Sequence, residues 1–293
     1  SHVDLPKKLY QVVNVFRYET KTTRPLIRVR EVSTFKEAHT AHATFEESEA
    51  QVKAATEVYK AFFDALCVPC CISRRPEWDK FAGAIYSDGF DTILPDGRTL
   101  QCGTVHNLGQ NFAKAFDVTY ETKDGKRQHI WQTCYGISER WLAGVLGVHG
   151  DDNGAVLPPK IAPVQVVIVP IHHKEKMKKI NETCTEVGEK LRKACTRVEI
   201  DLREEVTPGS KFFDWELKGV PIRIEIGPRD LDRGEAVVVR RDTFEKTSVE
   251  LDKLTDYVQR LMERMMNEMR EKAWKNMKEH INRANSLGEV KQL

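Results

Sequence analysis

The chain has 293 residues, 31% of them charged, and a formal net charge of +2. Chains of this length usually form two domains, because a single hydrophobic core rarely grows far beyond about 250 residues. The near-zero net charge excludes a general polycation, so any nucleic-acid surface must be a local patch. No apolar run approaches the roughly 20 residues of a membrane span, and the first residues lack the apolar core of a signal peptide. We therefore expect a cytoplasmic protein without membrane association.

The first half of the chain predicts strands at residues 9–16 and 26–32, joined by a polar loop. Apolar residues at helical spacing predict a helix over 45–66, with Thr44 as its N-cap and an acidic first turn. Further strands are predicted at 68–73, 86–94, 98–103, 117–121 and 128–134, and further helices near 107–115 and 138–149. We take residues 1–150 as the first domain.

Residues 151–163 combine Gly, Asp, Asn and Pro without any period, which predicts a linker. A smaller α/β domain is predicted at 164–248, followed by a C-terminal helical region at 249–293. Its expected elements are strands at 164–171, 196–202, 220–226 and 235–241, a charged helix at 173–195, a loop at 207–219 and a turn at 227–230. Thr247 and Glu250 predict a capping box that opens a helix from about 249 to 284.

Seven cysteines, an odd number, form no regular disulfide framework, and this favours reduced thiols. Cys67, Cys70 and Cys71 have the spacing of half a zinc site. No second C-x-x-C pair is present to complete four ligands. We therefore expect these cysteines to lead into a buried strand, and we predict no zinc in this chain.

Residues 16–31, FRYETKTTRPLIRVRE, carry several arginines and glutamates across the first two predicted strands. Arg17 and Glu19 share one strand face, and Arg28 and Arg30 share another. Arginine can bind phosphate through two nitrogens, and a carboxylate can accept a hydrogen bond from an adenine amino group. The two strands could thus form a nucleotide-binding face. A solvated hairpin surface is the alternative, because charge runs usually face water.

The predicted helix at 138–149 is apolar nearly all round and should be buried. Arg140 lies in its first turn, just after the possible N-cap Ser138. A buried helix N-terminus beside an arginine favours an anion. The alternative is that Arg140 pairs with a structural carboxylate.

Two further polar groups lie near predicted strand ends. Thr104 and His106 follow a strand, at a strand-to-helix junction where ligands often bind. Phe35, Glu37 and His39 alternate on one strand face. An aromatic ring, a carboxylate and an imidazole could together receive a small ammonium compound.

Together these segments resemble the class II aminoacyl-tRNA synthetases. FRYE and RPLIRVRE are similar to motif 2 of that family, and GISERWLAGVLGVHGD is similar to motif 3. GTVHNLGQNF and WELKGVPIR resemble more specifically the prolyl-tRNA synthetases of the archaeal and eukaryotic type, and the likeness covers nearly the whole chain. The resemblance implies an α/β (α+β) protein, in which a catalytic domain with an antiparallel sheet precedes a smaller α/β anticodon-binding domain.

The resemblance also implies a reaction and a set of partners. ATP, with Mg²⁺, would convert L-proline to prolyl adenylate, and the prolyl group would then pass to tRNA(Pro). The full-length protein would be a homodimer. A non-catalytic tRNA-binding paralogue or regulator built from the same domains is the alternative.

The residue roles implied by the resemblance fall into five sets. Arg17 and Arg140 would be catalytic. The ATP site would comprise Arg17, Glu19, Arg28, Gln101, Gln132, Ser138 and Arg140, and Glu121 and Gln132 would bind Mg²⁺. The proline site would comprise Phe35, Glu37, His39, Phe81, His106, Cys134 and Gly136. Guanines of the anticodon would contact Glu216, Lys218, Arg223 and Glu225, and Phe213 or Trp215 would stack on a base.

The chain departs from the family pattern at both ends. No counterpart of motif 1, or of the T-x-E loop that holds the proline amine, lies in residues 1–9. The C-terminal zinc-like domain of the family does not follow the predicted helix. We therefore expect the chain to be a fragment of a longer protein.

Overall fold

The computed structural model describes residues 1–171 and 175–292. Clustering of close contacts divides the chain into two compact units. The first unit contains Ser1–Asp64, Val68–Gly144 and Met277–Leu293, and the second contains Ala65–Cys67 and Val145–Asn276. Within the described residues, no helix has the length and apolar character needed to cross a membrane.

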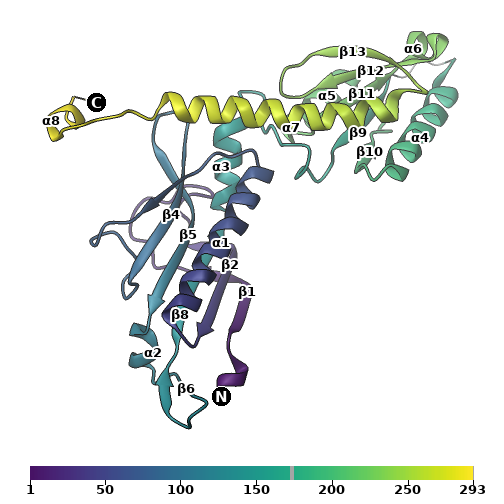
Figure 1. Ribbon diagram of the computed structural model, residues 1–293. Coiled ribbons are helices and arrows are strands. Elements are labelled where there is room, and N and C mark those ends of the chain that lie inside the picture. Colours follow the sequence, from purple (N-terminus) through teal and green to yellow (C-terminus); the bar gives the residue numbers. More distant parts are fainter. Residues whose placement is uncertain (172–174, 293) are drawn as a thin grey trace. The chain divides into compact units, whose positions relative to one another are not determined.

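The first unit is built on a six-stranded sheet whose neighbouring strands all run antiparallel (Figure 1). In spatial order the strands are β1 (Lys7–Phe16), β2 (Glu31–His42), β8 (Trp131–Ser138), β5 (Thr99–Gly109), β4 (Tyr86–Ile93) and β3 (Cys71–Arg74). A separate hairpin pairs β6 (Thr119–Glu121) with β7 (Arg127–His129). This arrangement confirms the antiparallel sheet that the sequence predicts for the first domain.

Helix α1 (Phe45–Ala65) covers one face of this sheet. Its Tyr59 ring packs edge-on against Phe90 of β4 and Tyr135 of β8, with centroids 5.5 and 6.0 Å away. The hydroxyl of Thr44 accepts a hydrogen bond from Glu47 N at 3.2 Å, which confirms the predicted N-cap. The unit also contains a short 3₁₀ turn (His2–Asp4), α2 (Asn111–Ala115), the start of α3 (Arg140–His149) and α8 (Leu287–Val290).

The second unit has a five-stranded mixed sheet. In spatial order its strands are β10 (Val198–Ile200), β9 (Val166–Pro170), β11 (Ile222–Ile226), β12 (Glu235–Arg240) and β13 (Lys246–Glu250). The first two pairs are parallel and the last two antiparallel. The helices after β9 are α4 (Met177–Lys193), α5 (Pro208–Leu217), α6 (Pro228–Arg233) and the long α7 (Leu254–Glu279).

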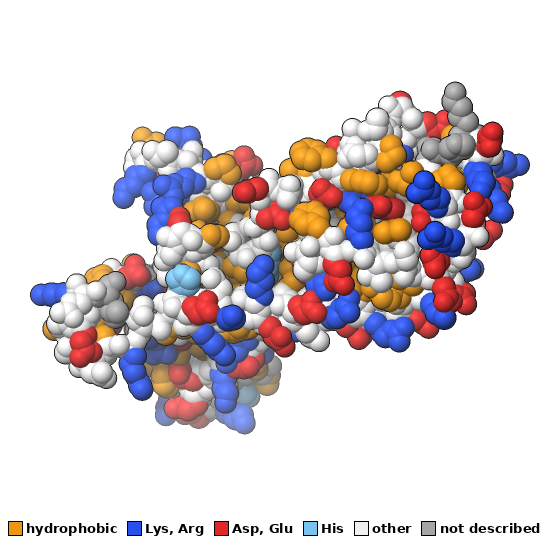
Figure 2. Space-filling model, turned by 90° about the horizontal axis from the view of Figure 1, so that it is seen from above, with side chains coloured by type: hydrophobic (Ala, Val, Ile, Leu, Met, Phe, Trp, Pro, Cys, Tyr) orange, Lys and Arg blue, Asp and Glu red, His pale blue; other side chains and the backbone are white. Residues whose placement is uncertain are grey.

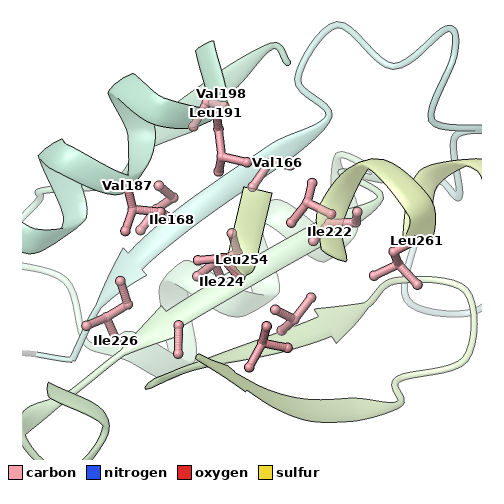
Figure 3. Close-up of a cluster of buried hydrophobic side chains, with 14 of the residues drawn as sticks. Val166, Ile168, Val187, Leu191, Val198, Ile222, Ile224, Ile226, Leu254 and Leu261 are labelled. Atoms are coloured by element: carbon pink, nitrogen blue, oxygen red, sulfur yellow. The ribbon is translucent and has the colours of Figure 1, made fainter. Parts of the chain in front are cut away.

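Branched aliphatic side chains fill the core of the second unit. Ile168, Ile222 and Ile224 are fully buried between the sheet and its helices. Leu191 of α4 and Leu254 of α7 join the same cluster (Figure 3). On the face drawn in Figure 2, Lys and Arg side chains are interspersed with Asp and Glu, in keeping with the small net charge. The predicted fold class is confirmed for both parts of the chain.

Several predicted elements of the first unit differ from the structure. The strand predicted at 26–32 is wrong, because β2 begins only at Glu31 and the preceding segment is irregular. The helix predicted near 107–115 is shorter, because β5 continues through Gly109 against β4 and β8. Hydrogen bonding of β5 to both neighbouring strands stabilises the extended backbone at these residues, whatever their helix propensity.

Three predicted elements of the second unit also differ from the structure. The predicted loop at 207–219 is the helix α5, which Thr207 caps and Pro208 begins. The turn at 227–230 opens α6. Thr247 does not cap a helix, because it lies in β13 opposite Val238 and α7 starts at Leu254. Residues 173 and 174 of the predicted helix at 173–195 lie outside the described residues, and its described part is α4.

Candidate active site

A pocket of about 330 Å³ opens on the first unit. Its floor includes Phe35 and Glu37 of β2, Cys134 and Gly136 of β8, and Thr104 of β5. Tyr135, which alternates with two of these residues on β8, packs against α1 on the other side of the sheet. The pocket therefore lies on the sheet face that α1 leaves open.

The segment after β1 brings charged side chains to one end of the pocket. Arg17 N donates a hydrogen bond to Arg30 O at 2.7 Å, and the chain between them forms an irregular loop. Arg17, Glu19 and Arg28 of this loop line the pocket, and Glu19 lies 3.8 Å from Arg28 Nε. The structure thus brings these residues together, although none of them lies on a strand. The guanidinium of Arg30 is not part of the lining.

Arg140 enters the pocket from the first turn of α3. Its Nε donates to Ile27 O at 3.1 Å and its Nη1 to Gln101 O at 3.4 Å. Burial lowers the pKa of Arg140, and the positive charges of Arg17 and Arg28 lower it further. Within residues 1–171 and 175–292, neither Arg17 nor Arg140 has a carboxylate within the 4.0 Å of an ion pair. Glu19, Glu37 and Glu139 also line the pocket, but two arginines without an ion-pair partner can still bind phosphate there.

A supporting network fixes Gln101, which also lines the pocket. In the amide orientation that satisfies both groups, Gln101 Oε1 accepts from Arg75 Nη2 at 2.8 Å and from Arg75 Nε at 3.2 Å. Arg75 Nη2 also donates to Asp91 at 2.6 Å. This orientation leaves the amide nitrogen of Gln101 available as a donor. The Arg75 contact was not predicted, since nothing in the sequence near Gln101 indicates it.

The other end of the pocket is lined by aromatic and imidazole rings. The ring centroids of Phe81 and His106 lie 5.0 Å apart, and His106 Nδ1 lies 2.7 Å from Ser87 Oγ. Burial lowers the pKa of His106 to about 4, so the ring is neutral at physiological pH. A Cβ on Gly136 would come within 3.2 Å of the Phe35 ring, so a larger residue there would press on that ring.

Most of the predicted ligand-site residues line this pocket, but three do not. His39 lies on β2 beside the pocket and Gln132 at the start of β8, and neither is among its lining residues. Glu121 is exposed on β6, in the separate hairpin. The structure therefore gives no support to a Mg²⁺ site of Glu121 and Gln132. Ile27 and Glu139 were missed as lining residues, although Glu139 directly precedes Arg140.

In the second unit, three of the four predicted anticodon residues contact one another, and the fourth, Lys218, is exposed. Arg223 is 8% exposed, and its guanidinium lies 2.5 Å from Glu216 and 3.0 Å from Glu225. The Lys218 ammonium lies over the Trp215 ring, 4.3 Å from its centroid. Arg223 is therefore already bound by two carboxylates and does not present the open donor pair that guanine recognition needs. Phe213 is 57% exposed and remains accessible.

Comparisons with known proteins match both units. Residues 1–149 match the family model "tRNA synthetase class II core domain (G, H, P, S and T)". The chain belongs to the class II tRNA synthetases. Residues 165–261 of this synthetase chain match a second model, "Anticodon binding domain".

Curated relatives of this class II synthetase are similar along its whole length. The chain is 55% identical over 293 residues to a protein named "Proline--tRNA ligase" from Methanopyrus kandleri, covering 100% of this chain and 60% of the relative. It is 53% identical over 292 residues to a protein of that name from Pyrococcus abyssi, covering 100% and 61%. The chain thus spans about 60% of the length of the relatives it matches.

Proposed function

We propose that the protein is a proline–tRNA ligase that activates L-proline with ATP and transfers the prolyl group to tRNA(Pro). The observation that carries this proposal is the pair Arg17 and Arg140. Both line one pocket of a class II synthetase core, and neither has a carboxylate partner in the part of the chain described. Paralogues that only bind tRNA have no need of two such arginines in one pocket.

The proposed chemistry needs no side-chain nucleophile. A carboxylate oxygen of proline attacks the α-phosphorus of ATP, and the bond to pyrophosphate breaks. Arg17 and Arg140 neutralise the charge that gathers on the phosphates, and they align the reacting groups. A ribose hydroxyl of the tRNA then attacks the carbonyl carbon of the adenylate, and AMP leaves.

The remaining lining residues fit the two substrates. Gln101, held by Arg75, can donate through its amide nitrogen, and Glu19 can accept from an amino group of adenine. Phe35, Phe81 and the neutral His106 form a small, largely apolar wall that suits the proline ring. Glu37 supplies a carboxylate for the amine of the substrate.

ATP would bring Mg²⁺ bound to its phosphates, which a site with few protein ligands suits. The carboxylates that line the pocket are Glu19, Glu37 and Glu139, and these fit such an ion better than Glu121 or Gln132. We retain the expected homodimer, the cytoplasmic location and the division into domains at 1–150 and 164–248 as parts of the same proposal.

The second unit would bind the anticodon stem-loop. Because Arg223 is held by Glu216 and Glu225, we propose that Phe213 and Lys218 contact RNA directly and that Arg223 keeps the two carboxylates in place. Trp215 is less suited to stacking on a base, because its Nε1 donates to Asp201 at 2.8 Å.

The test is proline-dependent exchange of pyrophosphate into ATP. It should use protein of natural full length, since the chain spans about 60% of its relatives. Arg17→Ala and Arg140→Ala should each lower the exchange rate about 100-fold or more, because each removes charge that stabilises the transition state. Binding of tRNA should change little.

Arg30→Ala is the matched control, because Arg30 belongs to the same loop and its side chain does not line the pocket. It should keep nearly full exchange activity. Absence of exchange by the folded wild-type protein would reject the ligase and favour the tRNA-binding paralogue. Unchanged exchange in Arg17→Ala would reject the role given to that residue.

A further inference from the structure

Three side chains at the edge of the pocket bring potential metal ligands unusually close together. Glu37 Oε1 lies 3.3 Å from His39 Nε2. Cys134 Sγ lies 3.6 Å from the same Glu37 oxygen and 3.7 Å from the same His39 nitrogen. The oxygen, nitrogen and sulfur atoms therefore form a nearly equilateral triangle.

The strand register produces this triangle. Glu37 and His39 are two residues apart on β2, so their side chains leave the same sheet face. Cys134 lies directly opposite His39 on β8. Gly136, opposite Glu37, has no side chain to occupy the space between the strands. The backbone thus holds all three ligand atoms without a flexible loop.

The triangle has the dimensions of a tetrahedral zinc site. Bonds of about 2.0–2.3 Å to oxygen, nitrogen and sulfur at tetrahedral angles place neighbouring ligand atoms roughly 3.3–3.7 Å apart. One carboxylate and one thiolate also balance the charge of Zn²⁺, so the occupied site would carry no net charge. A neutral site suits Cys134, which is only 6% exposed.

We propose that Glu37, His39 and Cys134 bind a zinc ion, with the fourth coordination position open to the pocket. Three protein ligands with one free position is the arrangement of zinc ions that meet a substrate, whereas structural zinc has four protein ligands. The C-x-x-C pattern gave no sign of this site, because its ligands come from two strands far apart in the sequence. The alternative is that the three groups only hydrogen-bond to one another.

A zinc ion here would compete with the amine of an amino-acid substrate. Glu37 and Cys134 line the part of the pocket that we assign to proline. If Glu37 coordinates zinc, it no longer accepts a hydrogen bond from the substrate amine. This second step rests on the proposed function, whereas zinc binding itself does not.

The test uses cobalt as a visible substitute for zinc in the metal-free 293-residue chain. Co²⁺ should bind at one site per chain, produce a thiolate-to-cobalt charge-transfer band in the near ultraviolet, and be displaced by Zn²⁺. Cys134→Ser should remove the band. His39→Gln, at a residue whose side chain is half exposed, should weaken zinc binding at least about 100-fold without disturbing the fold.

Cys71→Ser is the matched control, because Cys71 is an exposed thiol on β3 outside the pocket. It should leave the cobalt band unchanged. Absence of the band in wild-type protein, or an equal band in Cys134→Ser, would overturn the zinc site and leave a hydrogen-bonded cluster. Neither result would bear on the proposed activation of proline.

The competition between zinc and proline is tested by a separate measurement. L-proline should weaken zinc binding to the wild-type chain, as measured with a fluorescent zinc chelator, and glycine at equal concentration should do so less. Zinc affinity that does not respond to proline would reject the competition while keeping the metal site.

Discussion

Gly89 lies on β4 directly beneath the guanidinium of Arg75. A Cβ atom on Gly89 would come within 2.6 Å of Arg75 Nε and Cζ, well inside van der Waals contact. The guanidinium would have to move, and with it the hydrogen bonds to Asp91 and Gln101. A residue that touches no ligand therefore controls the position of one that lines the pocket.

Gly89→Ala should raise the ATP concentration at half-maximal exchange about 5-fold, since a hydrogen bond from Gln101 is worth about 1 kcal/mol. The concentration of proline at half-maximal exchange should change less. Gly209→Ala is the control, because a Cβ there meets no atom within 4 Å. Equal ATP dependence in both folded variants would show that Arg75 does not position Gln101.

The secondary-structure elements show where local sequence signals were read correctly and where they were overlooked. Thr44 was read as a cap, and its hydroxyl accepts from Glu47 N. Thr207 plays the same part in α5, where its hydroxyl accepts from Ser210 N at 3.3 Å. The pattern Thr-Pro at a helix start is as informative as Thr44, so α5 could have been predicted from the sequence.

Thr207→Ala should lower the free energy of unfolding of the second unit by about 1 kcal/mol, because an amide at the start of α5 loses its partner. Thr185→Ala provides the comparison, since the Thr185 hydroxyl bonds to Asn181 O inside α4 and caps nothing. That variant should stay within about 0.5 kcal/mol of wild type in urea denaturation. Equal losses in the two variants would show that the cap contributes nothing specific.

At the scale of the whole chain, each unit has its own buried interior. Ile224 is fully buried in the cluster between β11 and α7, and every member of that cluster belongs to the second unit. The ATP site proposed here belongs to the first unit. Stability of the second core and binding at the pocket should therefore be separable.

Ile224→Ala should lower the unfolding free energy of the second unit by about 2–5 kcal/mol, through lost burial and the cavity left behind. ATP affinity, measured by calorimetry at a temperature where the variant is folded, should remain that of wild type. Phe213→Ala, at an exposed position, should change stability by less than about 0.5 kcal/mol. ATP affinity that falls together with the stability of the second core would contradict this separation.

The sequence by itself determined the fold class, the family and most of the residues that line the pocket. The resemblance to class II synthetase motifs indicated Arg17, Arg140, Gln101 and His106 as site residues, and all four line the pocket. Apolar residues at helical or alternating spacing predicted α1 and most of the strands. These are local signals, and they can be read without knowing which segments meet.

Only the tertiary structure decided which arginine side chains have a carboxylate partner and which do not. Arg223 looked like a guanine-binding residue, yet two carboxylates hold it. A structural carboxylate was the alternative partner for Arg140, yet backbone oxygens hold its guanidinium. The Glu37, His39 and Cys134 triangle likewise depends on the register of β2 against β8. A one-residue shift of β2 against β8 would separate the three atoms of that triangle.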